Sequence, residues 1–237
     1  MRIVRLCIVL GSLSLIGLAQ NQTTLTTNPK DTARPVSALL DQLRKRERIS
    51  VTYEDPRYSK RADMDEKPAE FSYIAEEFHA PYDTEATVAR MLRQYGASGG
   101  LTFAVVQDGM RLHVVPSETF DSTGQRVRQD SILDTVISVP SGRRTTSQLL
   151  QLICDEVKKE TGYQIDVGPS DPTTTASTNQ AVDHQTARAA IGRLLDSLAT
   201  PGAFVWDLYY DPADRTYGLN FSYVGPAAAP AQKPVSH

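Results

Sequence analysis

The chain contains the same sequence pattern twice. Residues 36–55 align with residues 150–169, and residues 88–105 align with residues 191–208. Few residues are identical, but apolar residues fall on apolar residues along both alignments, including Leu43 on Val157 and Leu92 on Leu195. A repeat constrains the fold strongly, because each copy is expected to form the same structural unit. The sequence therefore predicts two tandem units of one architecture.

The spacing of apolar residues predicts the elements of each copy. In the first copy, a helical stripe over 36–43 is followed by strand alternation over 49–53, a helical stripe over 88–95 and a hairpin around residues 107–109. The second copy repeats this order with a helix over 149–157, a strand over 163–167, a helix over 187–198 and a hairpin over 204–224. Two helices on one face of a small sheet make a two-layer unit. We therefore expect an α+β fold of two tandem two-layer units, each with two helices packed on a small β-sheet.

Capping residues indicate where three of these helix ends lie. Thr145 and Gln148 have the spacing of a capping box, and Asp83 is suited to start the second helix of the first copy. Gly162 is suited to end the helix that the capping box begins. Further strands are expected near residues 71–75 and 135–139.

Composition outside the repeats indicates how the chain is divided. The first 19 residues combine two arginines with a short apolar run and small residues before the expected cleavage point, which is typical of a signal peptide. That run is too short for a membrane span, so we expect no integral membrane segment after cleavage. We therefore expect a signal peptide at 1–19, a flexible lead at 20–34, a first α+β unit at 35–117, a connector at 118–131, a second α+β unit at 132–224 and a disordered Pro/Ala tail at 225–237.

Charge, cysteines and histidines argue against several function classes. The formal net charge is −3 and no basic stripe is present, so we expect no nucleic-acid partner. Cys154 is the only cysteine outside the expected signal peptide; we predict a buried thiol and no disulfide. The four histidines, His79 and His113 among them, show no metal-ligand spacing, so we expect no metal and no cofactor.

No catalytic constellation is found in the sequence. Glu54 and Asp55 form the one notable carboxylate pair, but neighbouring strand residues point to opposite faces and would not converge on one substrate atom. Because Pro56 follows, we expect them to be surface residues at a turn. Neither a G-x-S-x-G motif nor a phosphate-binding glycine loop is present. The sequence favours a protein that is not an enzyme, with a hydrolase the least favoured alternative.

The C-terminal hairpin is the one local enrichment in aromatic residues. Either one of its faces is core and the other half exposed, or it presents a tyrosine-rich binding surface. On the second interpretation, the candidate binding residues are Tyr209, Tyr210, Tyr217 and Tyr223. The backbone of its outer strand is also expected to be free to pair with a partner strand.

The order of elements resembles a known module. A helix with a leucine stripe leads into a short strand over 149–167, and a helix with paired leucines precedes a hairpin over 186–224. This order is similar to the short N-terminal domain of secretins and TonB-dependent receptors. The similarity covers 134–224 best and 36–116 less well. The whole chain also resembles a group of uncharacterised exported bacterial proteins, through the segments 50–56, 113–116 and 131–134.

The resemblance implies a location and a class of function. In secretins and receptors this module is a periplasmic docking element attached to a channel or barrel, and we expect no channel role here because no barrel follows residue 224. It implies an exported protein, periplasmic or extracellular, that docks to a cell-envelope protein. The alternative hypothesis is a protein that binds a small molecule or glycan through the aromatic C-terminal hairpin.

Overall fold

The computed structural model describes residues 22–27, 33–60, 69–78, 83–169, 172, 176–198 and 201–225. The expected signal peptide, His79 and all of the expected Pro/Ala tail except Gly225 lie outside the described residues.

Both copies of the repeat form the same series of elements. The first unit contains β1 (Gln22–Thr26), α1 (Pro35–Glu47), β2 (Val51–Glu54), β3 (Glu70–Ile74), the short 3-10 helix η2 (Ala75–Phe78), α2 (Thr84–Ala97), β4 (Phe103–Asp108) and β5 (Arg111–Pro116). The second unit contains β8 (Val136–Val139), β9 (Arg144–Thr145), α3 (Thr146–Thr161), β10 (Gln164–Val167), β11 (Ser177–Thr178), β12 (Val182–Thr186), α4 (Ala187–Asp196), β13 (Ala203–Asp211) and β14 (Thr216–Val224). Between them lie β6 (Glu118–Phe120), β7 (Arg126–Arg128) and the 3-10 helix η3 (Ile132–Asp134).

The two units share one strand order. In the first unit β2 lies beside β5 and β5 beside β4; in the second, β10 lies beside β14 and β14 beside β13. In each case the first pair is parallel and the second is an antiparallel hairpin. The aligned residues Leu43 and Val157 are both buried, as are Leu92 and Leu195. These findings agree with the repeat seen in the sequence.

The two small sheets are joined edge to edge, which the sequence pattern did not indicate. Strand β13 pairs in parallel with β2, with Asp207 opposite Tyr53 and Leu208 opposite Glu54. The result is a single six-stranded sheet in the order β10-β14-β13-β2-β5-β4. The fold is α+β, as expected, with each pair of helices packed on its own half of the sheet.

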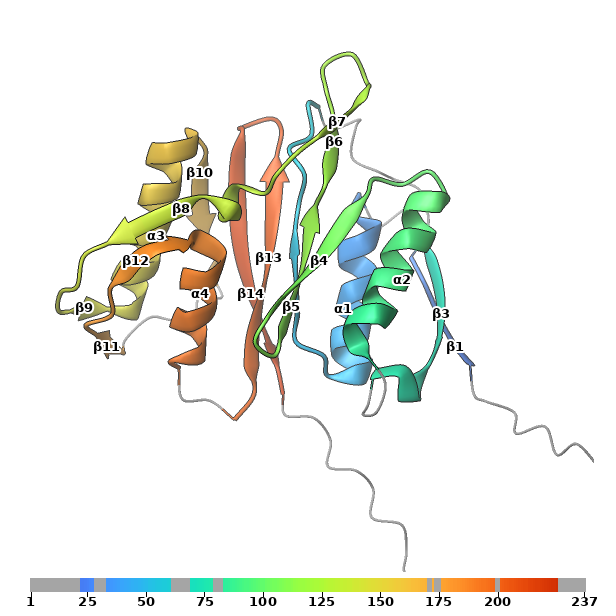
Figure 1. Cartoon of the computed structure of the whole chain (residues 1–237), viewed down its shortest axis with the longest axis horizontal. Helices are drawn as coiled ribbons and strands as arrows, with labels where there is room; N and C mark the ends of the chain where they lie inside the picture. Colours follow the sequence, from blue (N-terminus) through green and yellow to red (C-terminus); the bar gives the residue numbers. More distant parts are fainter. Residues whose placement is uncertain are drawn as a thin grey trace, which may run out of the picture.

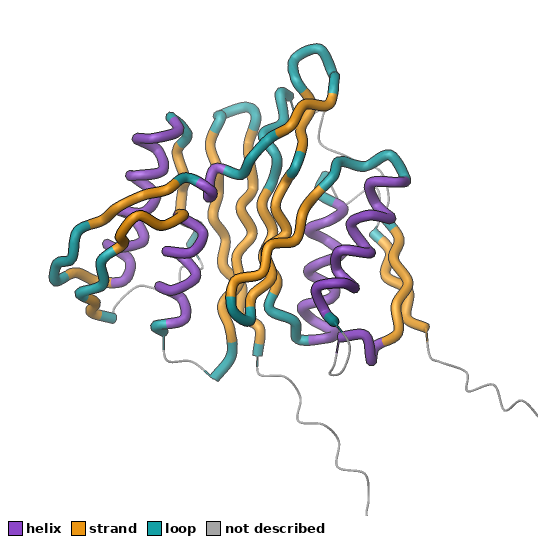
Figure 2. The backbone as a smooth tube through the Cα atoms, in the orientation of Figure 1, coloured by secondary structure: helices purple, strands orange, loops and turns teal. Residues whose placement is uncertain are grey.

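The helix pairs cover opposite faces of this sheet. Figure 1 shows α1 and α2 on one side of the central strands and α3 and α4 on the other, and Figure 2 shows the same division. Side chains along β13 alternate accordingly: Trp206 and Leu208 belong to the core under α3 and α4, whereas Asp207 bonds to Arg44 of α1. Because β10 also runs opposite to β2, a half-turn about an axis across the strands relates the two units.

Each unit also has a two-stranded ribbon on its helices. Strand β1 pairs with β3 in the first unit, and β8 pairs with β12 at the equivalent place in the second. Leu25 of β1 and Phe71 of β3 are buried in the same cluster as α1 and α2. The expectation of a flexible lead at 20–34 therefore does not hold for residues 22–26. The expected connector at 118–131 likewise contains the β6–β7 hairpin.

Helix ends lie where the capping residues predict. The Asp83 carboxylate accepts a hydrogen bond from the Ala86 N–H at the start of α2. Thr145 and Gln148 form a reciprocal capping box at the start of α3. Gly162 ends α3 in the left-handed conformation, with φ of 78°, which glycine adopts without a steric penalty.

Candidate functional site

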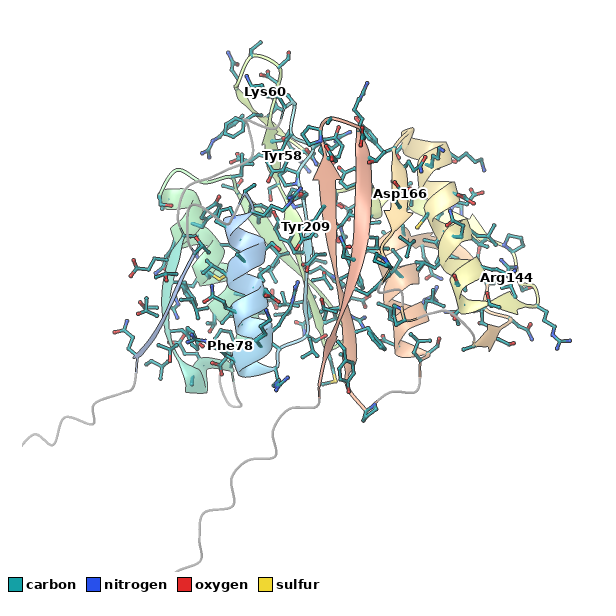
Figure 3. All side chains as sticks on the ribbon, turned by 180° about the vertical axis from the view of Figure 1, so that it is seen from behind. Tyr58, Lys60, Phe78, Arg144, Asp166 and Tyr209 are labelled. Atoms are coloured by element: carbon teal, nitrogen blue, oxygen red, sulfur yellow. The ribbon has the colours of Figure 1, made fainter. Side chains whose placement is uncertain are left out.

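The four candidate tyrosines do not form one exposed surface. Tyr210 and Tyr217 are buried among the core residues under α3 and α4. Tyr209 lies half-buried on the opposite face, where its hydroxyl and that of Ser37 are 2.8 Å apart. Figure 3 shows Tyr209 between the central strands and α1. Only Tyr223, with 49% of its surface exposed, is open to a partner.

The expectation of a free backbone along β14 is also wrong for the first part of the strand, Thr216 to Leu219. β14 lies inside the sheet, with β13 on one side and β10 on the other. The parallel pairing with β10 covers Thr216 to Leu219. The strands of the aromatic hairpin are therefore mainly structural elements.

Glu54 is buried rather than exposed at a turn, which corrects the sequence expectation. Its carboxylate accepts two hydrogen bonds from Arg188 of α4, of 2.7 Å to Oε1 and 2.8 Å to Oε2. The Ser131 hydroxyl donates to the same carboxylate, and Arg188 also bonds to Asp134. Because Glu54 is on β2 and Arg188 on α4, this cluster joins the two units.

Asp55 faces the other side of the sheet, as predicted for neighbouring residues of a strand. The Arg34 Nε atom lies 2.6 Å from its Oδ2, and the Tyr210 backbone N–H donates to the same oxygen at 2.9 Å. Arg44 of α1 forms a similar bidentate pair with Asp207 of β13. Each of these carboxylates holds one unit against the other. Asp55 is buried rather than exposed at a turn as expected, and burial raises its pKa to about 6.

His113 is fully buried in the centre of the sheet. Its Nδ1 is 2.8 Å from the Thr52 hydroxyl, and its ring lies 5.2 Å from that of Trp206. Burial, followed by the charges of Arg188 and Arg111, lowers the pKa of His113 to about 3. The imidazole is therefore neutral near pH 7, which suits a structural role.

The remaining chemistry of the described residues is limited. Cys154 of α3 is buried in the core. Within the described ranges, no group of three histidine, cysteine or acidic residues could hold a metal ion. None of the described helices is long and apolar enough to cross a membrane.

One edge of the six-stranded sheet is open and lacks protection. In the part of the chain that the structure describes, β4 pairs only with β5, in unbroken register from Phe103 to Asp108. Natural edge strands are usually short, charged, bulged or interrupted by proline. β10, at the other edge, is four residues long and exposes Gln164 and Asp166. β4 instead has no charge before Asp108 and exposes Val106 (40%).

A groove begins where β4 ends. It has a volume of about 810 Å³ and is formed by both units. Met110, 96% exposed, stands in its wall at the β4–β5 turn. The lining residues are Arg48, Ile49, Ser50, Asp83, Thr84, Glu85, Gln107, Asp108, Gly109, Met110, Arg111, Leu112, Arg193, Asp196, Gly202, Ala203, Val224 and Gly225.

A second cleft, of about 490 Å³, lies at the opposite end of the central strands, by the β13–β14 turn. The labelled Tyr58 marks this end in Figure 3. The lining residues are Arg57, Tyr58, Ser59, Thr119, Phe120, Asp121, Tyr163, Tyr210, Pro212 and Arg215. Of the candidate tyrosines, only Tyr210 lines it. Arg57, Tyr163 and Arg215 were missed from the sequence because they are far apart in the chain and share no motif.

Comparison with known proteins gives no match: no family model, no curated protein and no solved structure is similar to this chain.

Proposed function

We propose that this protein is a non-enzymatic docking protein that binds an extended segment of a cell-envelope partner along the edge of β4. The observation that carries the proposal is the open edge of β4, uncharged from Phe103 to Gln107 and unpaired within the described residues. Adding a strand to such an edge is a common mode of peptide recognition, in which backbone hydrogen bonds give affinity and alternate side chains give specificity.

The repeat supplies an internal example of this binding. β13 occupies in the second unit the position that β4 occupies in the first, and its outer edge is covered by β2 in parallel. In that pairing the Leu208 carbonyl accepts from the Asp55 N–H. Val105 aligns with Leu208 in the repeat, so its backbone is expected to point out of the open edge. We infer that a partner strand pairs with β4 in parallel.

Hydrogen bonds on the inner side of β5 agree with the outward direction of the Val105 backbone. The Leu112 N–H donates to Ser50, away from β4. In an antiparallel pair the residue opposite then also points outward, and Gln107 is opposite Leu112. The free donors are therefore those of Phe103, Val105 and Gln107. A partner strand would also contact Val106 and continue into the groove beside Met110.

The expected signal peptide supports the proposal of export. The resemblance to the N-terminal domains of secretins and receptors supports the proposal of a cell-envelope partner. The described residues support a binding role over a catalytic one, because the buried carboxylates and His113 are all engaged in the fold. The glycan or small-molecule alternative is favoured by a separate observation, the cleft beside Tyr163.

Site-specific cross-linking in cells tests the docking surface. A photo-reactive residue at Val106 is expected to capture a discrete partner, whereas one at the equally exposed Leu152 of α3 is not. Gln107→Pro removes an outward N–H without touching the β4–β5 pairing and should abolish capture.

Val167→Pro is the matched control. Its N–H is expected to point out of the opposite edge, because the next residue, Gly168, donates to Leu219 of β14. This change should leave capture intact. Equal capture from Leu152, or capture that survives Gln107→Pro, would refute docking along β4. A captured partner with the mass of a second copy of this chain would identify self-assembly instead.

A further inference from the structure

We propose that the cleft beside the β13–β14 turn binds a small sugar acid through its carboxylate or phosphate group. Arg57 and Arg215 hold the anionic group, and the aromatic and hydroxyl side chains around them contact the sugar. This site is separate from the edge of β4 and does not depend on the docking function.

The cleft contains positive charge that the protein does not neutralise. Among the described residues, three arginines are buried, and each has a carboxylate partner: Arg44 with Asp207, Arg111 with Asp196 and Arg188 with Glu54. For Arg57 and Arg215, no carboxylate partner is found among the described residues. Guanidinium groups bind carboxylates and phosphates with paired, charge-assisted hydrogen bonds. Two unpaired guanidiniums lining one cleft therefore favour an anion between them.

The one acidic residue in the described lining does not cancel this charge. The Asp121 carboxylate accepts hydrogen bonds from the Thr123 backbone, the Thr123 hydroxyl and the Gln125 backbone, at 2.8, 2.6 and 3.0 Å. These bonds close the β6–β7 turn. They also lower the pKa of Asp121, the Thr123 hydroxyl contributing most. Asp121 therefore stays ionised, and together with Arg57 and Arg215 it leaves the described lining with one net positive charge.

Arg57 is held in place before any ligand arrives. Its N–H donates to the Gln129 side chain at 2.8 Å, and its carbonyl accepts from the Thr119 hydroxyl at 2.7 Å. Its guanidinium lies 5.3 Å from the centre of the Tyr163 ring, a cation–π geometry that keeps it at the cleft. A group ordered in this way loses less entropy on binding.

Arg215 is positioned by an unusual backbone conformation. Its φ of 56° is in the left-handed region, where residues other than glycine are uncommon and often mark ligand sites. From this position its side chain hydrogen-bonds with Tyr163 and Tyr210. The two arginines therefore approach the Tyr163 ring and hydroxyl from different segments of the chain.

The pKa of Tyr163 reflects the positive charge of the same two arginines. Burial acts to raise the pKa of Tyr163, but hydrogen bonds and charges from Arg215 and Arg57 outweigh it and lower that pKa. A field that favours a phenolate also favours a bound oxyanion. Behind them, the buried Tyr217 hydroxyl has no hydrogen-bond partner among the described residues. It is a further polar group close to the cleft, with its ring 4.8 Å from that of Tyr210.

Size and lining point to an organic anion rather than a bare ion. A volume of about 490 Å³ is in the range of small-molecule sites. Its lining includes aromatic rings, such as those of Tyr58 and Phe120, and hydroxyl groups, such as those of Ser59 and Thr119. Apolar ring faces and hydrogen-bonding groups match the two kinds of surface that a sugar presents.

Nuclear magnetic resonance of the full chain can test the site with three probes that share one sugar body. Glucuronate carries a carboxylate, glucose 6-phosphate carries a phosphate, and glucose is the neutral control. At least one of the anions is expected to shift the side-chain Nε–Hε signals of Arg57 and Arg215 saturably, while glucose does not. The anion that binds identifies the group recognised.

Charge-removing variants complete the test. Arg57→Gln and Arg215→Gln should each weaken binding by about tenfold or more, the usual effect of losing a charge-assisted hydrogen bond. Arg143→Gln removes the same charge from an exposed residue just before β9, far from the cleft, and should leave affinity unchanged. Failure of both anions to shift the two arginine signals, an equal response to glucose, or equal weakening by Arg143→Gln would overturn the proposal. Cross-linking through Val106 is expected to be unaffected by either cleft variant, so the two functions can fail separately.

Discussion

Replacing Glu54 by glutamine tests whether the buried contacts between the units determine stability. The change keeps the size of the side chain but leaves the buried Arg188 without its main counter-charge. Breaking a buried ion pair on one side usually costs about 3–5 kcal/mol. Asp134 still bonds to Arg188 at 2.5 Å and is partly exposed to solvent, so we expect the lower end, about 3 kcal/mol. For a chain of this size that corresponds to a fall in Tm of about 6–12 °C.

Urea unfolding followed by circular dichroism measures this effect. The transition midpoint should fall with no change in the dependence on denaturant. Asp130→Asn is the matched control, because Asp130 forms only an exposed pair with Arg128 at 3.5 Å and should lose under about 0.5 kcal/mol. A loss below about 1 kcal/mol for Glu54→Gln, as for most surface residues, would refute the buried placement of this carboxylate and with it the joined sheet.

Three further predictions concern the core and the hairpin. Leu195→Ala is expected to cost about 2–5 kcal/mol because Leu195 is buried in α4, whereas Leu152→Ala at the exposed side of α3 should cost under about 1 kcal/mol in the same denaturant titration. Burial lowers the pKa of His113 to about 3, so the unfolded chain binds a proton at this residue first as the pH falls below about 6.5, and His113 alone lowers stability by about 2 kcal/mol between pH 7 and pH 5. Burial raises the pKa of Asp55 to about 6, which acts in the opposite direction over the same range, so the His113 effect is measured as the difference in pH dependence between the unchanged protein and His113→Gln. Tyr217→Ala should cost about 3–5 kcal/mol, and Tyr223→Ala should leave Tm nearly unchanged; similar losses for the two would contradict their placement on β14.

Features determined by near neighbours in sequence could be predicted. The helical stripes, the Asp83 cap and the Thr145–Gln148 capping box depend on contacts within a few residues, and the hairpin around Gly109 depends on a local turn. Because the pattern occurs twice, the sequence also predicted that the two units share one architecture. Strand β1 was missed because only Leu25 is apolar in its five residues, and its pairing partner β3 lies more than forty residues away.

Two errors about particular residues have a common physical cause. Glu54 was assigned to a surface turn because Pro56 follows, and Tyr209 was assigned to the sheet face that a two-layer unit leaves uncovered. The parallel contact between β13 and β2 puts helices of the other unit on that face: α4 covers Glu54 and α1 covers Tyr209. The strand pairing itself, of residues 53–55 with 207–208, uses backbone atoms, which are the same for every sequence. No side-chain pattern therefore identifies the partner strand.

A partial signal was present in the sequence. Strands covered on both faces are apolar at consecutive positions, whereas half-exposed strands alternate. Val205 and Trp206, and again Val114 and Val115, are consecutive apolar residues in the centre of strands, and all four are buried. The candidate cleft has no such signal, because Arg57, Tyr163 and Arg215 meet only when the two units are in place.

The half-turn that relates the units also explains why the two ends of the sheet differ. Within the chain, the first strand of one unit, β2, covers the hairpin edge of the other, β13. This leaves one edge of each type: β10, which corresponds to β2, and β4, which corresponds to β13. The β10 edge is short and polar. The β4 edge is uncharged from Phe103 to Gln107, as expected for a strand that is covered on that side. The edge that β2 covers on β13 is therefore open on the equivalent strand β4 among the described residues, and under the proposed docking function its expected occupant is a parallel strand of the partner.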